Sequence, residues 1–254
     1  MEKNKGHIQS VGKALMILDL LGANHKEMSL GEITKKLGFS KPTAHSLLST
    51  LRTFGYVKHF SSDGSYWLGV RLFELGSCVL DGWDFRKAAI PFIEELMQEL
   101  QETVQLAVLD GGEVLYVEKR ESHQSLRVVS DIGKRLPVHC TGLGKCLLAF
   151  SSPGEIQKII LVKGLPRYTS NTITDPDLLN KELEKIKSQG YAIDNEEIME
   201  GLRCVAAPIM NIKGEVVAAI SISGPVGRLK DEQIEFAKRH VVETAQQISA
   251  FLSS

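Results

Sequence analysis

The first seventy residues carry hydrophobic side chains at the three- and four-residue spacing of amphipathic helices. A first helix is expected over residues 11–21. A second begins at Ser29, which forms a capping box with Glu32, and it stops at Gly38. Ser40 can cap a third helix that has Pro42 in its first turn, where a missing N–H costs little. The spacing predicts that this third helix buries Ala44, Leu47, Leu48 and Leu51.

Two strand-like segments, residues 56–60 and 66–68, follow the third helix. Asp63 and Gly64 lie between them and form a dipeptide typical of tight hairpin turns. Three helices followed by a hairpin predict a winged helix-turn-helix, whose third helix enters the major groove of DNA. Small polar side chains on the outward face of that helix can bond base edges. The candidate DNA contacts are Ser40, Lys41, Thr43, His45, Ser46 and Ser49 of the helix, with Lys58 and His59 of the wing.

The same helices would also suit a small bundle that never contacts DNA, and the distribution of charge bears on this alternative. Residues 1–75 contain ten Lys and Arg against six Asp and Glu, a net charge of +4. The remaining residues contain 20 against 25, a net charge of −5. A basic N-terminal region on an acidic body suits phosphate binding at one end only. The helix pattern, the hairpin and the charge together favour DNA binding.

Beyond residue 70 the pattern changes. A helix with one apolar stripe over residues 71–82 is expected to link two domains. Strands grouped around a few helices, without regular βαβ alternation, then predict an α+β domain on a mostly antiparallel sheet. The predicted division is a winged helix-turn-helix domain at 1–70, a linker helix at 71–85 and a second domain at 86–254. In the second domain the expected helices are 86–102, 141–150, 153–161, 177–189 and 230–252, and the expected strands are 104–109, 114–119, 126–129, 191–194, 204–210 and 216–223.

The composition is that of an ordinary soluble protein, with 254 residues of which 43% are hydrophobic and 24% charged. The sequence has neither a signal pattern nor an apolar run long enough to cross a bilayer, so a cytoplasmic location without a membrane partner is expected. The cysteines show no CxxC spacing, which argues against a zinc ribbon, and disulfides are rare in cytoplasmic proteins. Free thiols, with no metal and no cofactor, are therefore expected at Cys78, Cys140, Cys146 and Cys204.

Three segments of the C-terminal half resemble the IclR family of bacterial transcription regulators. They are GYAIDNEEIMEGLRCVAAPI over residues 190–209, AISISGP over 219–225 and HCTGLGKCLLA over 139–149. The resemblance runs through nearly the whole chain. It implies an N-terminal DNA-binding domain, a linker helix, and a C-terminal domain similar to the GAF and PAS sensor folds that binds a small metabolite. Most members of the family repress transcription and some activate it, so repression is the expected mode.

The helix expected from residue 141 begins in a way that suits an anion, because Gly142 and Gly144 let a ligand approach backbone N–H groups at the positive end of the helix dipole. Ser221 and Ser223 are two apart on a strand, so both hydroxyls face one side and could hold oxygens of the ligand. Each of these residues also has a plainer explanation in packing. Apolar wall is expected from Leu143 and Leu148, and the family pattern carried over to this chain implies effector contacts at Gly142, Leu143, Asp194, Cys204, Ser221 and Ser223.

The alternative is a thiol- or metal-dependent enzyme that acts on a small organic acid. A thiol nucleophile with its base, or a metal site, could be formed by His139, Cys140, Asp194 and Cys204. No glycine-rich phosphate loop, paired acid/base signature or HExxH motif appears in the sequence. An enzyme would consume the compound that stabilises it, whereas a sensor would not. Local ion pairs and caps that position a loop are expected of Glu196, Glu197 and Arg203.

The expected mechanism starts from a homodimer that pairs through its N-terminal domains and reads a pseudo-palindromic operator in double-stranded DNA; the sensor domains can pair again into a homotetramer. A small anionic metabolite would shift the linker helices and so change operator affinity. A hydroxy or keto acid suits the predicted site, and aromatic and sugar acids stay open. Many family members have Arg where this chain has Ser46, so base contacts are expected either to be fewer or to move to Lys41, His45, Lys58 and His59.

Overall fold

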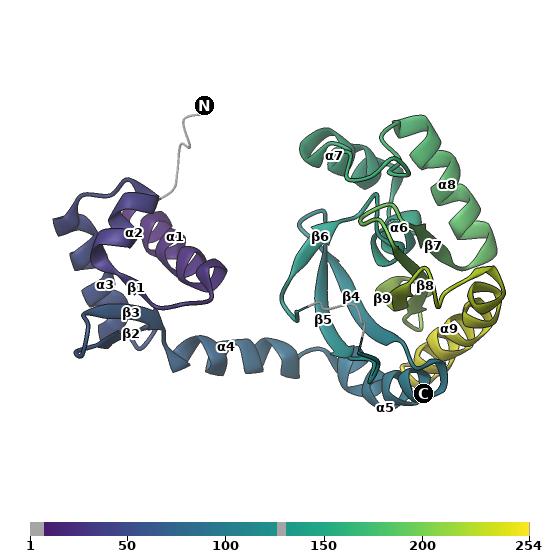
Figure 1. The fold of residues 1–254 in the computed structure, drawn as a ribbon, viewed down its shortest axis with the longest axis horizontal. Helices are drawn as coiled ribbons and strands as arrows, with labels where there is room; N and C mark the ends of the chain where they lie inside the picture. The colour runs from purple at the N-terminus through teal and green to yellow at the C-terminus, as the bar shows by residue number, and fades with distance from the viewer. Residues whose placement is uncertain (1–7, 126–130, 254) are drawn as a thin grey trace. The chain divides into compact units, whose positions relative to one another are not determined.

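The computed structural model describes residues 8–125 and 131–253 of the chain. The chain divides into two compact units, Met1–Gly82 and Trp83–Ser254 (Figure 1). The first unit is a winged helix and the second is an α+β domain on an antiparallel sheet, so the predicted fold class is confirmed. None of the helices in the described ranges has the length and apolar character needed to cross a bilayer.

The first unit contains three helices, a small antiparallel sheet and a fourth helix. They are α1 (Gln9–Asn24), β1 (Met28–Ser29), α2 (Leu30–Leu37), α3 (Lys41–Thr53), β2 (Val57–Phe60), β3 (Ser65–Leu68) and α4 (Val70–Asp81). The sequence did not predict β1, which pairs with β3 and gives the sheet the order β1-β3-β2. Helix α1 is longer than the expected 11–21. The fully buried core of the unit includes Ile17, Leu21, Ile33 and Leu48.

The helix ends of the first unit follow their sequence signals. The Oγ of Ser29 accepts the N–H of Glu32 at 3.3 Å, and the Glu32 carboxylate accepts the N–H of Ser29 at 2.8 Å, so the predicted capping box is formed. Gly38 ends α2 with φ of 69°, a left-handed conformation that glycine adopts at little cost. Ser40 caps α3 by accepting the N–H of Thr43 at 3.4 Å. These contacts fix the turn between α2 and α3.

The second unit is built on a six-stranded sheet with the order β6-β5-β4-β9-β8-β7, in which neighbouring strands are antiparallel. The strands are β4 (Thr103–Asp110), β5 (Glu113–Arg120), β6 (Arg135–Pro137), β7 (Ala192–Asn195), β8 (Leu202–Met210) and β9 (Val216–Pro225). The sequence did not predict β6. The strand predicted at 126–129 lies outside the described residues.

Two groups of helices cover the two faces of this sheet. Because side chains alternate along a strand, Val205 and Ala207 of β8 pack in one core with α5 and α9, whereas Ala206 packs in another with α6 to α8. Figure 1 shows the two groups on opposite sides of the sheet. The helices are α5 (Asp84–Leu100), α6 (Gly142–Ala149), α7 (Pro153–Lys163), α8 (Pro176–Gln189) and α9 (Asp231–Phe251).

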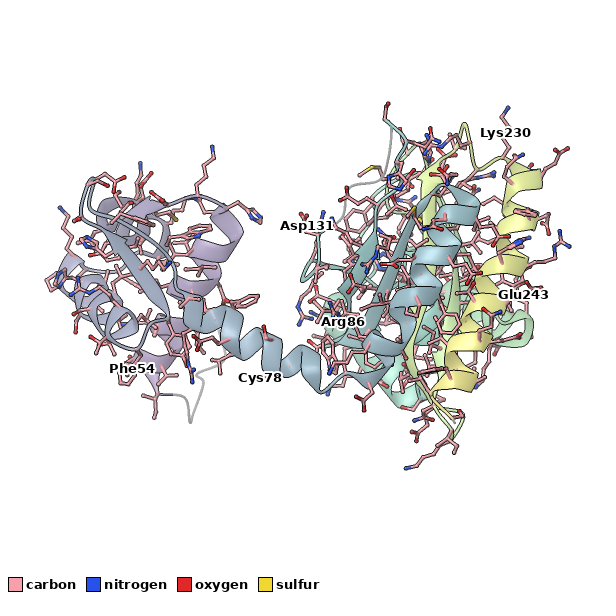
Figure 2. The ribbon with its side chains drawn as sticks, turned by 90° about the horizontal axis from the view of Figure 1, so that it is seen from below. Phe54, Cys78, Arg86, Asp131, Lys230 and Glu243 are labelled. Atoms are coloured by element: carbon pink, nitrogen blue, oxygen red, sulfur yellow. The ribbon has the colours of Figure 1, made fainter. Side chains whose placement is uncertain are left out.

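All four cysteines are free thiols, as the sequence predicted. Cys78 is exposed on α4, where Figure 2 labels it, and the other three are buried in the second unit.

Candidate functional site

The candidate DNA contacts on the helix lie in and just before α3. Among those within α3, Lys41, His45 and Ser46 are exposed, whereas Thr43 and Ser49 are half-buried. The hydroxyls of Ser40 and Thr43 are 2.8 Å apart within the N-terminal cap of α3. These two side chains already hold the start of the helix, so the exposed side chains of Lys41, His45 and Ser46 are the ones placed to reach a base edge.

The wing candidates Lys58 and His59 are both exposed on β2. As neighbours on a strand they point to opposite faces of the hairpin. The His59 ring lies against the Tyr66 ring of β3, with centroids 4.6 Å apart. A DNA surface on one side of the wing would therefore meet one of these two residues and not both.

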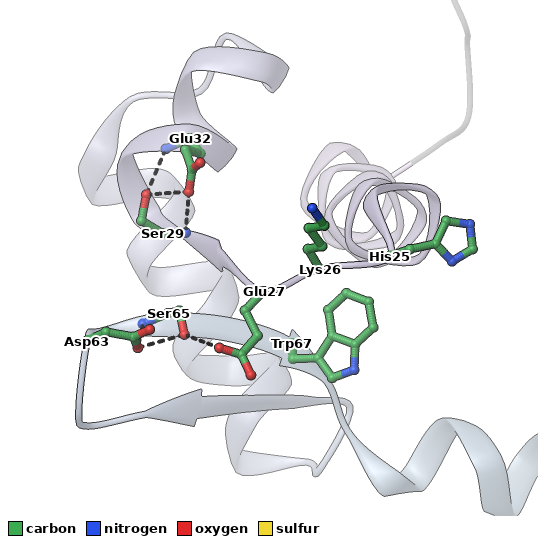
Figure 3. Close-up of a pocket in the computed structure, with 8 residues that line it drawn as sticks. All are labelled: His25, Lys26, Glu27, Ser29, Glu32, Asp63, Ser65 and Trp67. Carbon is green, nitrogen blue, oxygen red and sulfur yellow. Dashed lines mark hydrogen bonds between the residues drawn. The ribbon is translucent and has the colours of Figure 1, made fainter.

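A hollow of about 670 Å³ lies elsewhere on the first unit, between the residues that precede α2 and the hairpin (Figure 3). Its polar side chains are engaged with one another. Ser29 and Glu32 form the capping box of α2, and the Ser65 hydroxyl lies 3.1 Å from a Glu27 carboxylate oxygen and 2.7 Å from one of Asp63. These contacts hold β1 and the hairpin turn in place. The polar side chains of the hollow therefore have structural roles, and we do not assign a ligand to it.

The second unit contains a cavity of about 470 Å³, here called the α6 cavity. It opens beside the N-terminus of α6 and is walled by β4, β5, β8 and β9 and by the loop that follows β7. The structure brings all six effector candidates together in its lining: Gly142, Leu143, Asp194, Cys204, Ser221 and Ser223. The apolar wall comes from Leu136, Leu143, Ile198 and Leu202, and Gln105, Tyr116, Thr141 and Lys134 add polar groups. Leu148, which was expected in this wall, packs in the core beneath α6 instead.

The N-terminus of α6 forms one end of the cavity. The Thr141 hydroxyl accepts the N–H of Gly144 at 3.1 Å and donates to the carbonyl of Pro137 at 2.9 Å, so it caps the helix. The N–H groups of Gly142 and Leu143 belong to the first turn, where no intrahelical acceptor exists. Together with the helix dipole they favour an anion at this end of the cavity.

The two glycines of this turn serve different purposes. A Cβ on Gly142 would lie 3.5 Å from the Cβ atoms of Ala206 and Cys204, which is ordinary contact distance. A Cβ on Gly144 would lie 2.4 Å from the Cα and the carbonyl oxygen of Val138, closer than atoms can pack. The expectation that both glycines admit a ligand is therefore wrong for Gly144, which lets the helix pack against the chain before it.

The two serines share one acceptor inside the protein. Ser221 and Ser223 lie on one face of β9, as predicted, and their hydroxyls are 3.3 and 2.8 Å from Oε1 of Gln105 on β4. The Ser223 hydroxyl is also 3.1 Å from the Cys204 sulfur. Both hydroxyls donate within the protein, Ser221 to Gln105 and Ser223 to Gln105 or Cys204, so the serines can offer a ligand acceptor lone pairs, whereas a free donor was expected. Gln105 was missed, because its only signal in the sequence is a polar position in a strand, and that strand pairs with β9.

Asp194 is fully buried in the cavity wall and lies opposite Cys204 in the β7–β8 register. Its Oδ1 accepts the N–H of Glu197 at 2.7 Å, whereas its Oδ2 has no hydrogen-bond partner among the described residues. Burial raises the pKa of Asp194 to about 7, because the site disfavours a charged carboxylate. Asp194 is therefore poised between its neutral and charged forms near neutral pH.

The loop after β7 is tied to α6 by a buried ion pair. The Lys145 ammonium pairs with Glu197 Oε1 and donates to the carbonyl of Ile193 at 2.6 Å. Glu196 accepts the N–H of Gly201 at 2.8 Å within the same loop. Arg203 bonds the Asn195 side chain at 2.6 Å and Asp231 at 2.9 Å. The loop-positioning roles expected of Glu196, Glu197 and Arg203 are confirmed, although Lys145 was missed; a lysine within an otherwise apolar helix was the available signal.

The thiols near the cavity are poorly suited to nucleophilic chemistry. Burial raises the pKa of Cys140 to about 12 and that of Cys204 well above its ordinary value, so both stay protonated. Nε2 of His139 lies 3.0 Å from the carbonyl oxygen of Pro166. Within residues 8–125 and 131–253, no group of three or more His, Cys, Asp or Glu side chains is arranged to hold a metal ion.

Comparisons with known proteins agree with this geometry. The family models "IclR helix-turn-helix domain" and "Bacterial transcriptional regulator IclR C-terminal" match residues 10–59 and 77–250. The chain is 38% identical to the HTH-type transcriptional regulator XynR of Escherichia coli (strain K12), over 89% of this chain and 90% of that protein. It is 32% identical to the transcriptional repressor IclR of the same strain, over 96% and 90%.

A solved structure is also similar over nearly the whole chain. It is an IclR homolog from Microbacterium hydrocarbonoxydans complexed with 4-hydroxybenzoate, with a TM-score of 0.84 and 30% identity over 96% of this chain and 98% of that one. XynR is described as a transcriptional regulator and IclR as a transcriptional repressor, which argues against the enzyme alternative.

Proposed function

The chain belongs to the IclR family of bacterial transcriptional regulators, and on this premise we propose that a small organic acid, bound in the α6 cavity, controls its affinity for an operator. The protein is a DNA-binding transcriptional regulator with a C-terminal effector-binding domain.

The choice of an acid as the effector rests on one observation. The α6 cavity is largely apolar, and the positive end of the α6 helix dipole lies at its wall. The first-turn N–H groups of α6 and the ammonium of Lys134 supply positive potential, while the leucine and isoleucine side chains exclude water. About 470 Å³ falls within the usual range for small-molecule sites. An organic anion with an apolar or hydroxylated body fits these features.

The operator contacts are assigned to α3 and the wing. Lys41, His45 and Ser46 are exposed at or near the N-terminal end of α3, the end that contacts bases in helix-turn-helix proteins. A pseudo-palindromic site requires two copies of this helix. A dimer through the first unit would supply them, because α1 and α4 expose large apolar side chains, among them Leu15 and Phe73 at 55% and 74%.

Repression is the proposed mode of action, since the chain is similar to the transcriptional repressor IclR of Escherichia coli over nearly its full length. In this mechanism the acid binds more tightly to the arrangement of the dimer that has low operator affinity. The difference in affinity sets how far the equilibrium shifts. Helix α4 connects the DNA-binding and effector-binding parts along the chain and is the proposed linker.

The test is to select an operator from random-sequence DNA and to measure its binding with and without acids. The acids are pyruvate, D-gluconate and 4-hydroxybenzoate, which represent keto, sugar and aromatic acids. A true effector raises the melting temperature of the protein and changes operator affinity by about 5–150-fold without being consumed. Asp194→Ala and Ser221→Ala are expected to lose the response, whereas Ser170→Ala, at an exposed position outside the cavity, keeps it. Identical operator affinity in the presence of a stabilising acid would refute the mechanism.

A further inference from the structure

Two buried carboxylate oxygens of the second unit have unused hydrogen-bonding capacity, and one of them belongs to Asp194 in the lining of the α6 cavity. They are Oδ2 of Asp194 and Oε2 of Glu197, which have no partner among the described residues. Buried polar atoms almost always have a partner, so such an atom calls for a physical explanation. The other oxygen of each side chain is bonded: Asp194 Oδ1 to the N–H of Glu197, and Glu197 Oε1 to Lys145.

The charges around these carboxylates do not balance. Lys145 pairs with Glu197 and lies 3.7 Å from Glu182 on α8. Lys134 also lines the cavity, where Asp194 and Glu200 are the acidic side chains. Asp194 has no ion pair in the described part of the chain. An acidic effector would bring a further negative charge to the wall that Asp194 forms. Like charges at close range in a low-dielectric site cannot all remain ionised.

We propose that the side chain of Asp194 is in its neutral, protonated form when it binds the carboxylate of the effector. Its Oδ2 takes up one proton from water when an acid binds and donates the resulting O–H to a carboxylate oxygen of the ligand. The proton cancels the charge of Asp194, and the hydrogen bond gives Oδ2 the partner that it lacks. This inference rests on the proposed function. It adds that the protonated form of Asp194 is the form that selects acids as effectors.

Burial raises the pKa of Asp194 to about 7 and also raises the pKa of Glu197, and the charge of Lys145 opposes both rises. Lys145 pairs directly with Glu197, which leaves Asp194 as the buried carboxyl of the cavity lining that has no ion pair among the described residues. Burial also raises the pKa of the Tyr116 phenol and of the thiols, which stay protonated at neutral pH, and it lowers the pKa of His139. The titratable and charged groups that face Asp194 or share its cavity are Tyr116 of β5, Lys134 before β6, Cys140 and Lys145 at α6, Glu182 of α8, Glu197 and Glu200 after β7, and Cys204 of β8.

Calorimetry of the full-length protein tests the proton directly. Pyruvate, D-gluconate and 4-hydroxybenzoate are titrated at pH 6 and pH 8, each in two buffers of different ionisation enthalpy. For the acid that binds, we expect uptake of about 0.9 proton at pH 8 and about 0.1 at pH 6, since Asp194 is mostly ionised only at the higher pH. Affinity should fall by up to about tenfold per pH unit above pH 7.

Variants and a neutral ligand identify the site of the proton. Asp194→Asn keeps a neutral donor, so it should bind the acid at pH 8 with uptake near zero and without the loss of affinity. Glu184→Gln, at an exposed carboxyl on α8, should retain the wild-type uptake. For a binding aromatic acid, the amide 4-hydroxybenzamide should bind without proton uptake. Binding with no uptake at pH 8, or with uptake that persists in Asp194→Asn, would overturn the proton coupling alone. Failure of all three acids to bind would overturn the acidic effector itself.

Discussion

Gly144 is the residue on which the close packing of the α6 N-terminus depends. A Cβ at this position would lie 2.4 Å from two backbone atoms of Val138 and 2.6 Å from the Thr141 hydroxyl, and backbone cannot move aside as a flexible side chain can. We expect Gly144→Ala to lower the stability of the second unit by about 3 kcal/mol, in the range of overpacked cores. Thermal and urea unfolding of the variant measure this loss.

Gly154 provides the matched control for this substitution. It lies exposed in the first turn of α7, and a Cβ there would meet open space. Alanine has the higher helix propensity, so Gly154→Ala should be neutral or should stabilise by about 0.5–1 kcal/mol. Equal loss of stability in both variants would show that the contact with Val138 is not the cause.

Asp194 should also make the stability of the second unit depend on pH. Its pKa is about 7 in the folded protein against an ordinary 3.8, so between these values the folded state holds a proton that the unfolded chain has lost. Its contribution is fully present below pH 3.8 and is lost as pH rises through 7. We expect Asp194→Asn to raise the melting temperature by about 5 °C more at pH 8 than at pH 5.

Melting curves by circular dichroism at a series of pH values measure this difference. An equal effect of the substitution at both pH values would show that Asp194 is ionised at both, and Glu184→Gln serves as the exposed reference.

The partners of the site residues were harder to predict than the residues themselves. The motifs around residues 142, 194 and 221 carry the resemblance, so their members could be named from the sequence. Gln105 and Lys145 escaped because their roles depend on which strand and loop pack beside them. A polar residue in a strand and a lysine in an apolar helix each indicate that a partner exists. The partner of Gln105 depends on the β4–β9 register, and the partner of Lys145 depends on how the loop after β7 packs.

At the scale of elements, periodicity predicted the helices and the longer strands to within a few residues. Its failures, β1 and β6, are two and three residues long. Such segments contain too few positions for alternation to be visible, and their pairing with β3 and β5 comes from the neighbouring strands. The caps of α2 and α3 were predictable because a cap is local, with its donor and acceptor three residues apart.

Helix α3 should depend on His45 for specificity, because this imidazole is exposed near the N-terminal end of the helix. We expect His45→Ala to weaken binding of the selected operator by about 1–3 kcal/mol if the ring bonds a base edge. Competition assays against unrelated DNA measure the change in specificity. A uniform loss across all sequences would instead mark His45 as a phosphate contact. Thr50→Ala, further along the same helix, is the reference for a general effect on α3.

At the scale of the whole molecule, the proposed reading of a pseudo-palindromic operator requires that two copies of the first unit act together. Leu15 on α1 and Phe73 and Val79 on α4 expose 55%, 74% and 56% of their surface, so both helices present large apolar side chains that pairing could bury. A two-fold interface through these helices would bury them in pairs. Each substitution at such an interface appears twice, so one charge per chain becomes two charges in close contact.

Phe73→Glu is therefore expected to dissociate the dimer at micromolar concentration and to weaken operator binding at least about 100-fold, because the second recognition helix is no longer held near its half-site. Sedimentation equilibrium and operator titration measure the two effects. Leu161→Glu places the same charge at an 86% exposed apolar position on α7 of the second unit, and it should leave the first-unit dimer and the operator affinity intact. If Phe73→Glu remained dimeric with full operator affinity, pairing would have to proceed through other surfaces, and α4 could not hold the two DNA-reading helices at the operator spacing.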